Sequence, residues 1–345
     1  MKHRVVLIPG DGIGPEITKA ALMVVNATGV DIEWIIARAG RVAYKEVGTP
    51  LPEDVIDLIR EHKVVLKGPL ETPIGTGYRS VNVALRRIFN LFAIVRPVNS
   101  MFSSKAICDH IDLVLIREGV EGLYVGIDHY LDVNRTHAMA IKYASRDNCR
   151  RLVKFAFDYA IKYGRKKVTL AHKANILKIT EGMLREEFLE VAKLYPSIHA
   201  EDILIDSAVM GLVKEPERFN IIVTSNMFGD ILSGIVAGLV GSVGVIPSAN
   251  IGEQYAIFET AHGTAPEIAG RNIANPTAMI LSSAMLLDHI GLHREAQIIR
   301  ESTAKVIQEG KFLTRDIAKN GRGVSTLEMA KRIAEVVRNK LDELD

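Results

Sequence analysis

The stretch RVVLIPGDGIGPEITKAALMVV, residues 4–25, joins an apolar β-branched segment to a segment with helical periodicity through a turn that contains three glycines. This order predicts a strand followed directly by a helix. The glycines are spaced G-x-G-x-G, whereas the dinucleotide-binding fingerprint is G-x-G-x-x-G with an acidic residue about 20 residues later. Because glycine also serves where a tight turn needs positive φ, the local sequence leaves a nucleotide loop and a structural turn both open.

The same alternation of short β-branched runs with helix-period segments continues along the chain. Strands are predicted at residues 4–8, 31–37, 64–68, 91–97, 112–118, 166–172, 203–208 and 219–225, and helices at residues 17–25, 52–62 and 148–164. Such alternation is typical of an α/β fold with a largely parallel sheet covered by helices.

The chain of 345 residues is longer than one hydrophobic core usually serves. Two loops interrupt the alternating pattern, RPVNSMFSSKAI at residues 96–107 and PSANIG at residues 247–252. We therefore predict a large domain built from residues 1–98 and 250–345, with a small domain of residues 99–249 inserted into it.

Charge and cysteine content exclude several classes of partner. The 43 basic and 41 acidic residues are mixed along the chain, so we expect no nucleic-acid or membrane surface. Two cysteines, Cys108 and Cys149, fit a reducing cytoplasm better than a disulfide framework, and no secretory segment precedes the first strand. The uncharged run from Ile231 to Pro247 is too short and glycine-rich to cross a bilayer, and predicts a buried helix.

Polar residues at predicted strand ends and on one helix indicate an anion site. Ser80 is a candidate helix N-cap, and Asn82 and Arg86 lie four residues apart, which places them on one helical face. Lys67, Arg96 and Arg117 end three predicted strands, where open α/β sheets bind ligands. Any one arginine could be a surface charge, but together they suggest a substrate with two or three carboxylates.

Four further residues are candidates for metal binding and proton transfer. Asp206 and Asp230 could ligate Mg²⁺ or Mn²⁺, although an aspartate after a strand is more often a helix cap. Lys173 and Tyr124 could move protons, although a surface lysine and a core tyrosine are the common alternatives. The chain has neither zinc-type His/Cys spacing nor a G-x-S-x-G elbow.

Ordered motifs along almost the whole chain resemble those of the β-decarboxylating dehydrogenases, the isocitrate and isopropylmalate dehydrogenase family. They are GDGIGPE, KGPLETP, SVNVALR, HKANILK, NMFGDILS, PSANIG and HGTAPEIAGRNIANPTA. The resemblance implies a two-domain, non-Rossmann α/β fold with the small domain inserted into the large one. It also implies a homodimer, or a higher oligomer, whose active sites share residues across the interface.

The resemblance also implies roles for individual residues. The substrate, a small 2-hydroxy tricarboxylate, would be bound by Lys67, Ser80, Asn82, Arg86, Arg96 and Arg117. Asp230 and the partner's Asp206 would hold the metal, the partner's Lys173 would help to deprotonate the C2 hydroxyl, and Tyr124 would protonate the enolate. The cofactor would be bound by Ile13, Thr72, His262, Gly263, Thr264, Ala265, Glu267, Ile268 and Asn275.

Family patterns favour isocitrate as substrate and NAD as cofactor. Ser80, Asn82 and Arg86 fit the isocitrate-type pattern S-x-N-x-x-x-R, with homoisocitrate and 3-isopropylmalate as alternatives. Glu267 matches the acid that bonds the ribose hydroxyls in NAD enzymes, whereas three basic residues nearby could tolerate NADP: Arg315, Lys319 and Arg322. Gly234 replaces a second metal aspartate, which leaves a non-catalytic regulatory subunit as a rival to the active enzyme.

Overall fold

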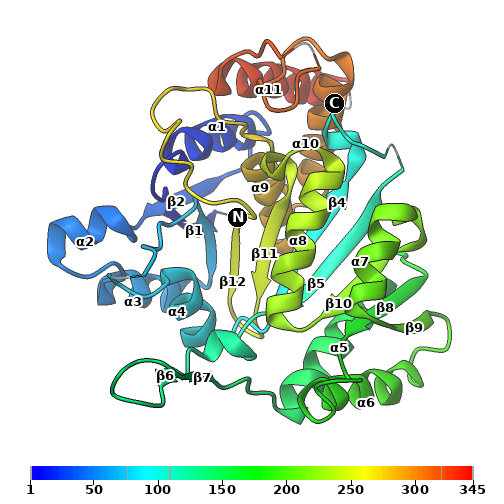
Figure 1. The fold of residues 1–345 in the computed structure, drawn as a ribbon. Coiled ribbons are helices and arrows are strands. Elements are labelled where there is room, and N and C mark those ends of the chain that lie inside the picture. The colour runs from blue at the N-terminus through cyan, green and yellow to red at the C-terminus, as the bar shows by residue number, and fades with distance from the viewer. Residues whose placement is uncertain (1, 76, 109, 320, 344–345) are drawn as a thin grey trace.

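The computed structural model describes residues 2–75, 77–108, 110–319 and 321–343. These residues form an α/β structure around one ten-stranded sheet (Figure 1). Across the sheet the strands are β2 (Ile32–Ile36), β1 (His3–Ile8), β3 (Val64–Lys67), β12 (Ala256–Thr260), β11 (Pro247–Ile251), β4 (Ala93–Asn99), β5 (Asp112–Glu118), β10 (Ile221–Thr224), β8 (Lys167–His172) and β9 (His199–Leu204).

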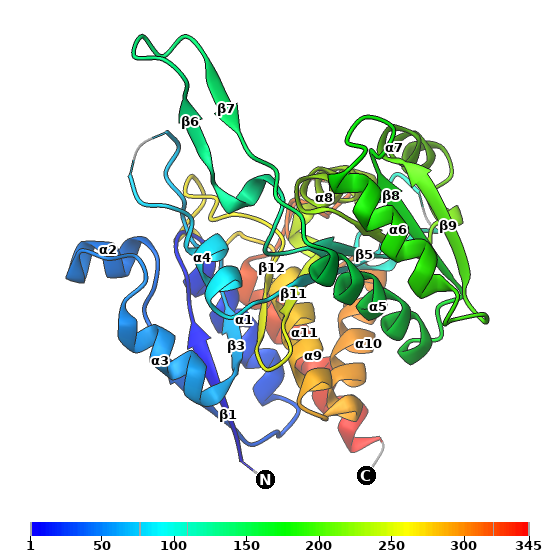
Figure 2. The same ribbon diagram turned by 90° about the horizontal axis from the view of Figure 1, so that it is seen from below.

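Helices cover both faces of this sheet. They are α1 (Gly14–Asn26), α2 (Arg41–Val47), α3 (Glu53–His62), α4 (Val81–Ile88), α5 (Arg146–Lys162), α6 (Thr180–Ala192), α7 (Ile205–Lys214), α8 (Asn226–Val240), α9 (Thr277–His289), α10 (His293–Glu309) and α11 (Thr326–Asp342). In Figures 1 and 2, α7 and α8 lie on the face opposite to α9 and α10. A hairpin of β6 (Asp128–Tyr130) and β7 (Ala138–Ala140) extends away from the body (Figure 2).

The first strand shows why both faces are covered. Val5 and Leu7 belong to the larger hydrophobic core, whereas Val6 and Ile8 belong to a smaller core on the other face, against α3 and α4. Alternate side chains of a strand point to opposite faces, so a continuous apolar run such as VVLI is buried only if both faces are covered. The predicted strand and helix at residues 4–25 are thereby confirmed.

The sheet is largely parallel, as predicted, except in its middle. The pairs β12–β11, β11–β4 and β4–β5 are antiparallel, and the other six pairs are parallel. For β11 and β12 the cause is a short connection, since the two strands are joined as a hairpin in which Gly252 N–H donates to the carbonyl of Tyr255 at 2.9 Å. Short connections of this kind can only join antiparallel strands.

Two local predictions need correction. The predicted strand at residues 203–208 ends at Leu204, and α7 begins at Ile205, so Asp206 lies in the first turn of a helix. The apolar run after Ile231 does form a helix, α8, but only one face is buried, since Ile231 itself is 54% exposed. In the part of the chain that the structure describes, no helix is long and apolar enough to cross a membrane.

The predicted domain division stays a prediction. Its two boundaries, 98/99 and 249/250, fall within β4 and β11, which are hydrogen-bonded neighbours in the centre of the sheet. The predicted small domain would therefore share a continuous sheet with the large one.

The glycine turn after β1 is a structural turn between packed loops. The N–H groups of Asp11, Ile13 and Gly14 donate to the carbonyls of Pro69, Thr264 and Asp11, at 2.7 to 2.9 Å. These amides are therefore engaged by the protein and do not form a free phosphate cradle. Gly12 has φ of +59°, and a Cβ added to it would lie 2.0 Å from the carbonyl oxygen of Thr264.

Replacing Gly12 by alanine should therefore destabilise the protein more than the same change at Gly29. Gly29 also has positive φ, +76°, but a Cβ there meets nothing within 4 Å. We expect Gly29→Ala to cost ~1–2 kcal/mol of unfolding free energy, from backbone strain alone. Gly12→Ala should cost a further ~1–3 kcal/mol, because the two loops must separate. Denaturant unfolding measures both, and equal losses would show that the close approach of the loops is unimportant.

Candidate active site

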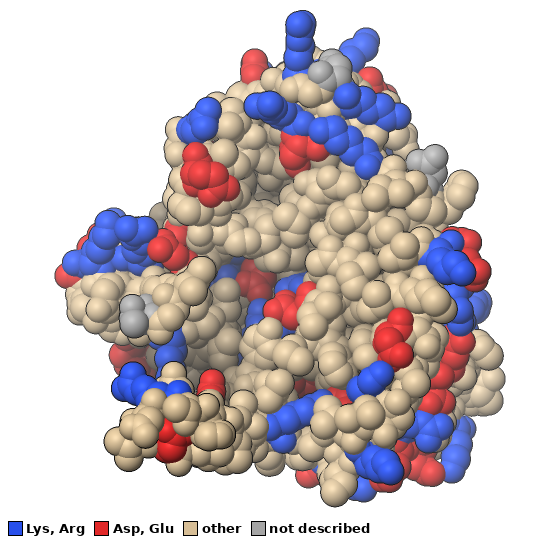
Figure 3. Space-filling view, viewed as in Figure 1, with Lys and Arg blue, Asp and Glu red and all other residues tan. Residues whose placement is uncertain are grey.

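A cavity of about 240 Å³ opens where α4, β4, β5, α8 and the loop after β12 meet. Figure 3 shows a hollow near the middle of this side of the molecule, with acidic and basic side chains at its base. The cavity brings together nine of the predicted site residues: Ser80, Asn82, Arg86, Arg96, Arg117, Tyr124, Asp230, His262 and Gly263.

Three arginines from separate elements form the cationic part of the cavity. Arg86 lies in the last turn of α4, Arg96 on β4 and Arg117 on β5, and they are 8%, 5% and 1% exposed. Ser80 is the N-cap of α4, where its hydroxyl accepts a hydrogen bond from Val83 N–H at 3.4 Å. The cap fixes the start of the helix and thereby aims Asn82 and Arg86 into the cavity.

Both burial and mutual repulsion lower the pKa values of Arg96 and Arg117. Burial, together with the positive charges of Arg117 and Arg86, lowers the pKa of Arg96 to about 10. Burial and the charge of Arg86 likewise lower the pKa of Arg117. Like charges held this close favour an added anion, so the cavity is suited to a ligand that carries several carboxylates.

Asp230 of α8 provides the counter-charge on one side. Its carboxylate pairs with Arg117, lies 3.7 Å from Arg96 Nη1 and accepts a hydrogen bond from the Tyr124 hydroxyl at 2.7 Å. Burial on its own would raise the pKa of Asp230, but the charge of Arg117 and the bond from Tyr124 hold it below its ordinary value. Burial and the neighbouring Asp230 raise the pKa of Tyr124, which keeps its phenol protonated.

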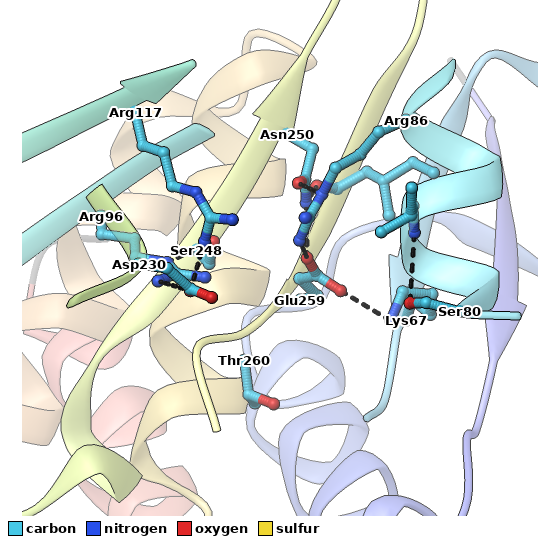
Figure 4. A network of polar contacts seen from close by, with 12 residues as sticks. Lys67, Ser80, Arg86, Arg96, Arg117, Asp230, Ser248, Asn250, Glu259 and Thr260 are labelled. Atoms are coloured by element: carbon cyan, nitrogen blue, oxygen red, sulfur yellow. Dashed lines mark hydrogen bonds and ion pairs between the residues drawn. The ribbon is translucent and has the colours of Figure 1, made fainter. Parts of the chain in front are cut away.

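Glu259 of β12 provides the counter-charge on the other side (Figure 4). Its carboxylate lies 2.6 Å from Lys67 Nζ and 3.4 Å from Arg86 Nη2, and it accepts a hydrogen bond from Asn250 at 2.8 Å. Asn250 in turn accepts a bond from Arg86 Nε at 2.9 Å. Lys67, predicted to contact the substrate, thus lies behind the cavity wall and acts on Arg86 through Glu259.

The predicted catalytic lysine and one of the two predicted metal ligands also lie outside the cavity. Lys173 follows β8, and its ammonium group lies 2.6 Å from the carboxylate of Asp206 at the start of α7. Both side chains are partly exposed, and neither lines the cavity that holds Tyr124 and Asp230. Within one chain, these two residues form a pair apart from Tyr124 and Asp230.

Most of the predicted cofactor residues belong to the loop between β12 and α9, and Ile13 contacts this loop. Ile13 N–H bonds Thr264 across the two loops at 2.9 Å, and both amide atoms of buried Asn275 have partners, Asp316 and Thr277. Thr72, Gly263 and Glu267 are exposed, and Ala265 and Ile268 are half-buried.

One ring nitrogen of His262 is a buried hydrogen-bond acceptor without a partner among the described residues, and a cofactor could bond to it. Its Nδ1 lies 2.9 Å from the carbonyl of Gly263 and must donate to it, which makes Nε2 an acceptor. Nε2 is buried and has no partner among the described residues. Burial lowers the pKa of His262, so the ring stays neutral. An unpaired acceptor beside the cavity fits a ligand that offers an N–H or O–H group, as a nicotinamide nucleotide does.

One chain by itself does not provide a complete metal site. Among the described residues, no three His, Cys, Asp or Glu side chains are grouped so that they could hold an ion. The position one helical turn beyond Asp230 on α8 is Gly234, which carries no carboxylate. A divalent ion would need donors from its substrate, from water or from another subunit.

Glu259 and the polar residues that hold the arginines in place were not among the predicted site residues. Asn226 accepts hydrogen bonds from Arg117 at 2.7 and 3.0 Å, and Ser233 and Ser248 accept bonds from Arg96 at 2.6 and 3.4 Å. The signal for two of them was present, because Ser248 and Asn250 alternate along an otherwise apolar strand. Glu259 gave no such signal, since its partner Lys67 is brought beside it by the pairing of β12 with β3.

Glu259→Gln should destabilise the protein at neutral pH. The change leaves Lys67 buried without an ionic partner, which typically costs ~3–5 kcal/mol. Glu33→Gln is the matched control, because Glu33 also pairs with two cations but at the exposed edge of the sheet. Chemical unfolding should show a large loss for the first variant and almost none for the second. Similar losses in both would contradict the buried role of Glu259.

The same pair predicts a dependence on pH. Burial would raise the pKa of Glu259, but Lys67 and Arg86 lower it from an ordinary 4.5 to about 2. Ionised Glu259 therefore stabilises the folded state above pH 4.5, and this contribution is lost as the pH falls towards 2. The stability difference between the native protein and Glu259→Gln should shrink over that range, and a constant difference would contradict the ionic account.

The chain is similar to known proteins over nearly its whole length. The family model "Isocitrate/isopropylmalate dehydrogenase" matches residues 4–333. The chain is 45% identical to 3-isopropylmalate dehydrogenase of Methanothermobacter thermautotrophicus over 96% of this chain and 97% of that protein. It is 42% identical to homoisocitrate dehydrogenase of Methanocaldococcus jannaschii, over 98% of this chain and 99% of that protein.

A solved structure gives the same result for the fold. Isocitrate dehydrogenase from Methylococcus capsulatus superposes with a TM-score of 0.95 at 47% identity, covering 97% of this chain and 99% of that one. These three relatives carry three substrate names at similar identity, so similarity alone does not select among the substrates. The match over nearly the whole sequence and fold nevertheless shows that this chain belongs to the isocitrate/isopropylmalate dehydrogenase family of decarboxylating dehydrogenases.

Proposed function

We propose that the protein catalyses the metal-dependent oxidative decarboxylation of isocitrate to 2-oxoglutarate and CO₂, with reduction of NAD. The observation that carries this proposal is the convergence of three buried arginines on one cavity that Ser80 and Asn82 also line. A tricarboxylate supplies the negative charges that these guanidiniums lack.

Ser80 and Asn82 support isocitrate over 3-isopropylmalate. Asn82 Oδ1 is buried without a hydrogen-bond partner among the described residues, and the amide orientation is interchangeable at that position. A carboxylate or hydroxyl of the substrate would satisfy this amide, whereas an isopropyl group would leave it unpaired at a cost. Homoisocitrate, which keeps all three carboxylates, is the second candidate.

Residues of this chain would hold the substrate and move its protons. The substrate carboxylates would take over Arg117 from Asp230, which frees the Asp230 carboxylate for a cation. Tyr124 keeps its proton and stands in the same cavity, so it can protonate the enolate that remains after CO₂ leaves. Bound NAD would accept the hydride, and Mg²⁺ or Mn²⁺ would polarise the C2 oxygen.

A second copy of the chain completes this proposal. Lys173 and Asp206 already form one unit outside the cavity, and both are accessible to a partner. We propose a homodimer in which this unit from one subunit faces Asp230 of the other, where Asp206 would share the metal and Lys173 would help to deprotonate the C2 hydroxyl. A higher oligomer built from such dimers and a cytoplasmic location are further parts of the proposal.

The proposed preference for NAD depends on the loop after β12. Glu267 is exposed there, where it could bond two ribose hydroxyls and repel a 2′-phosphate. Arg315, Lys319 and Arg322 lie in the segment between α10 and α11 and could moderate this repulsion. We therefore propose NAD as the main cofactor with some use of NADP.

Initial rates of NAD(P)H formation test the function. With Mg²⁺ or Mn²⁺, we expect isocitrate to be oxidised faster than homoisocitrate and 3-isopropylmalate, and faster with NAD than with NADP. Faster turnover of homoisocitrate would reverse the order of substrates. No reduction of either nucleotide with any of the three acids would favour a non-catalytic regulatory subunit.

Gly234→Asp should strengthen metal binding. A Cβ at Gly234 meets nothing within 4 Å, and the new carboxylate would lie one helical turn beyond Asp230. We expect the Mg²⁺ concentration for half-maximal rate to fall by about tenfold, as partners in metal sites commonly contribute. Gly238→Asp is the matched control one turn further, where a Cβ also meets nothing within 4 Å. An equal effect in both variants would point to general charge rather than ligation.

A further inference from the structure

A second cavity, of about 450 Å³, lies on the opposite face of the sheet from the arginine cavity. Strands β4 and β12 contribute to both cavities, because alternate residues point to opposite faces. Arg96 and Glu259 face the arginine cavity, whereas their neighbours Val95 and Phe258 line the second one. Helices α5, α9 and α10 supply its other walls, and the cavity is called the back cavity below.

Aromatic rings form two sides of the back cavity. On α5, the rings of Phe155, Tyr159 and Tyr163 follow one another, with centroids 6.3 and 4.3 Å apart. Across the cavity, Phe258 packs against His289 with centroids 5.5 Å apart. Walls of this kind favour a flat aromatic molecule over a branched aliphatic one.

One polar group of this aromatic wall lacks a partner. The Tyr159 hydroxyl makes no hydrogen bond to any of the residues that the structure describes. Burial raises the pKa of Tyr159 to about 12, so the phenol keeps its proton. It can therefore donate a hydrogen bond to a ligand in the cavity.

Two cations line the back cavity, and of these Arg300 forms an ion pair whereas Lys162 forms none among the described residues. Asp288 accepts hydrogen bonds from the Tyr163 hydroxyl at 2.9 Å and from His293 Nδ1 at 2.6 Å, and lies 3.7 Å from Arg300. The second carboxylate, Asp158, is bound by Lys154 and the Tyr195 hydroxyl, at 2.6 Å each. Lys162 lies over the Tyr163 ring at 5.1 Å and forms no ion pair with a carboxylate among the described residues. One anionic group of a ligand would complete this arrangement.

We propose that the back cavity is a binding site for a small ligand with a flat aromatic body and one anionic group. The body lies between the α5 rings and Phe258, the anion lies at Lys162 and Arg300, and the Tyr159 hydroxyl donates a hydrogen bond. The site is separate from the arginine cavity and does not depend on the function proposed above.

Isothermal titration calorimetry of the full-length protein with 2-naphthoate and with neutral 2-naphthamide tests the site. Naphthoate should bind, and naphthamide should bind at least about fivefold more weakly because it lacks the charge. Equal affinity, or no binding of naphthoate, would overturn the proposal.

Two variants locate the binding. Met285→Trp fills the cavity from α9 and should abolish naphthoate binding, whereas unchanged binding would place the probe elsewhere, as in the arginine cavity. Lys162→Ala removes an exposed side chain and should weaken naphthoate binding about fivefold. Because this change is on the surface, it still tests the proposal if Met285→Trp does not fold. Lys193→Ala, an exposed lysine at the end of α6, should bind like the native protein. Equal affinity of Lys162→Ala and Lys193→Ala would contradict the anion contact.

Discussion

Four cations share two carboxylates in the interior of this protein, and the active-site half of the structure depends on that imbalance. Lys67, Arg86, Arg96 and Arg117 are all buried, and their ion pairs are made with Asp230 and Glu259. Burial of unbalanced charge is costly unless hydrogen bonds and a ligand compensate. The side-chain amides and hydroxyls of Asn226, Ser233, Ser248 and Asn250 supply the hydrogen bonds, and a polycarboxylate would supply the missing charge.

The two carboxylates, Glu259 and Asp230, have different roles because their surroundings differ. Glu259 is 4% exposed and is paired with Lys67, Arg86 and Asn250, so it holds Arg86 in place. Asp230 lines the cavity and can exchange Arg117 for another partner when a substrate arrives. A site that binds an anion and a cation together needs both features. Glu259 supports Arg86 rigidly, and Asp230 is a carboxylate that can change partners.

Much of this organisation could be predicted from residue patterns, and the rest depends on strand order. The cap at Ser80 and the spacing of Asn82 and Arg86 are local, and the structure places all three in the cavity as expected. The antiparallel pairing of β11 with β12 follows from the hairpin at Gly252, which apolar runs do not reveal. Because β12 pairs with β3, Glu259 meets Lys67 across nearly two hundred residues, a contact that no local pattern contains.

The most direct measurement is a crystal structure of the protein with isocitrate bound. The account predicts that the carboxylates of isocitrate lie in the cavity between α4 and α8, within hydrogen-bond distance, ~2.7–3.2 Å, of Arg86, Arg96 and Arg117. Glu259 should keep its contacts with Lys67 and Arg86, and Asp230 should leave Arg117. Isocitrate bound outside this cavity, or arginines that keep their present partners and do not contact it, would contradict the claim that buried positive charge defines the substrate site.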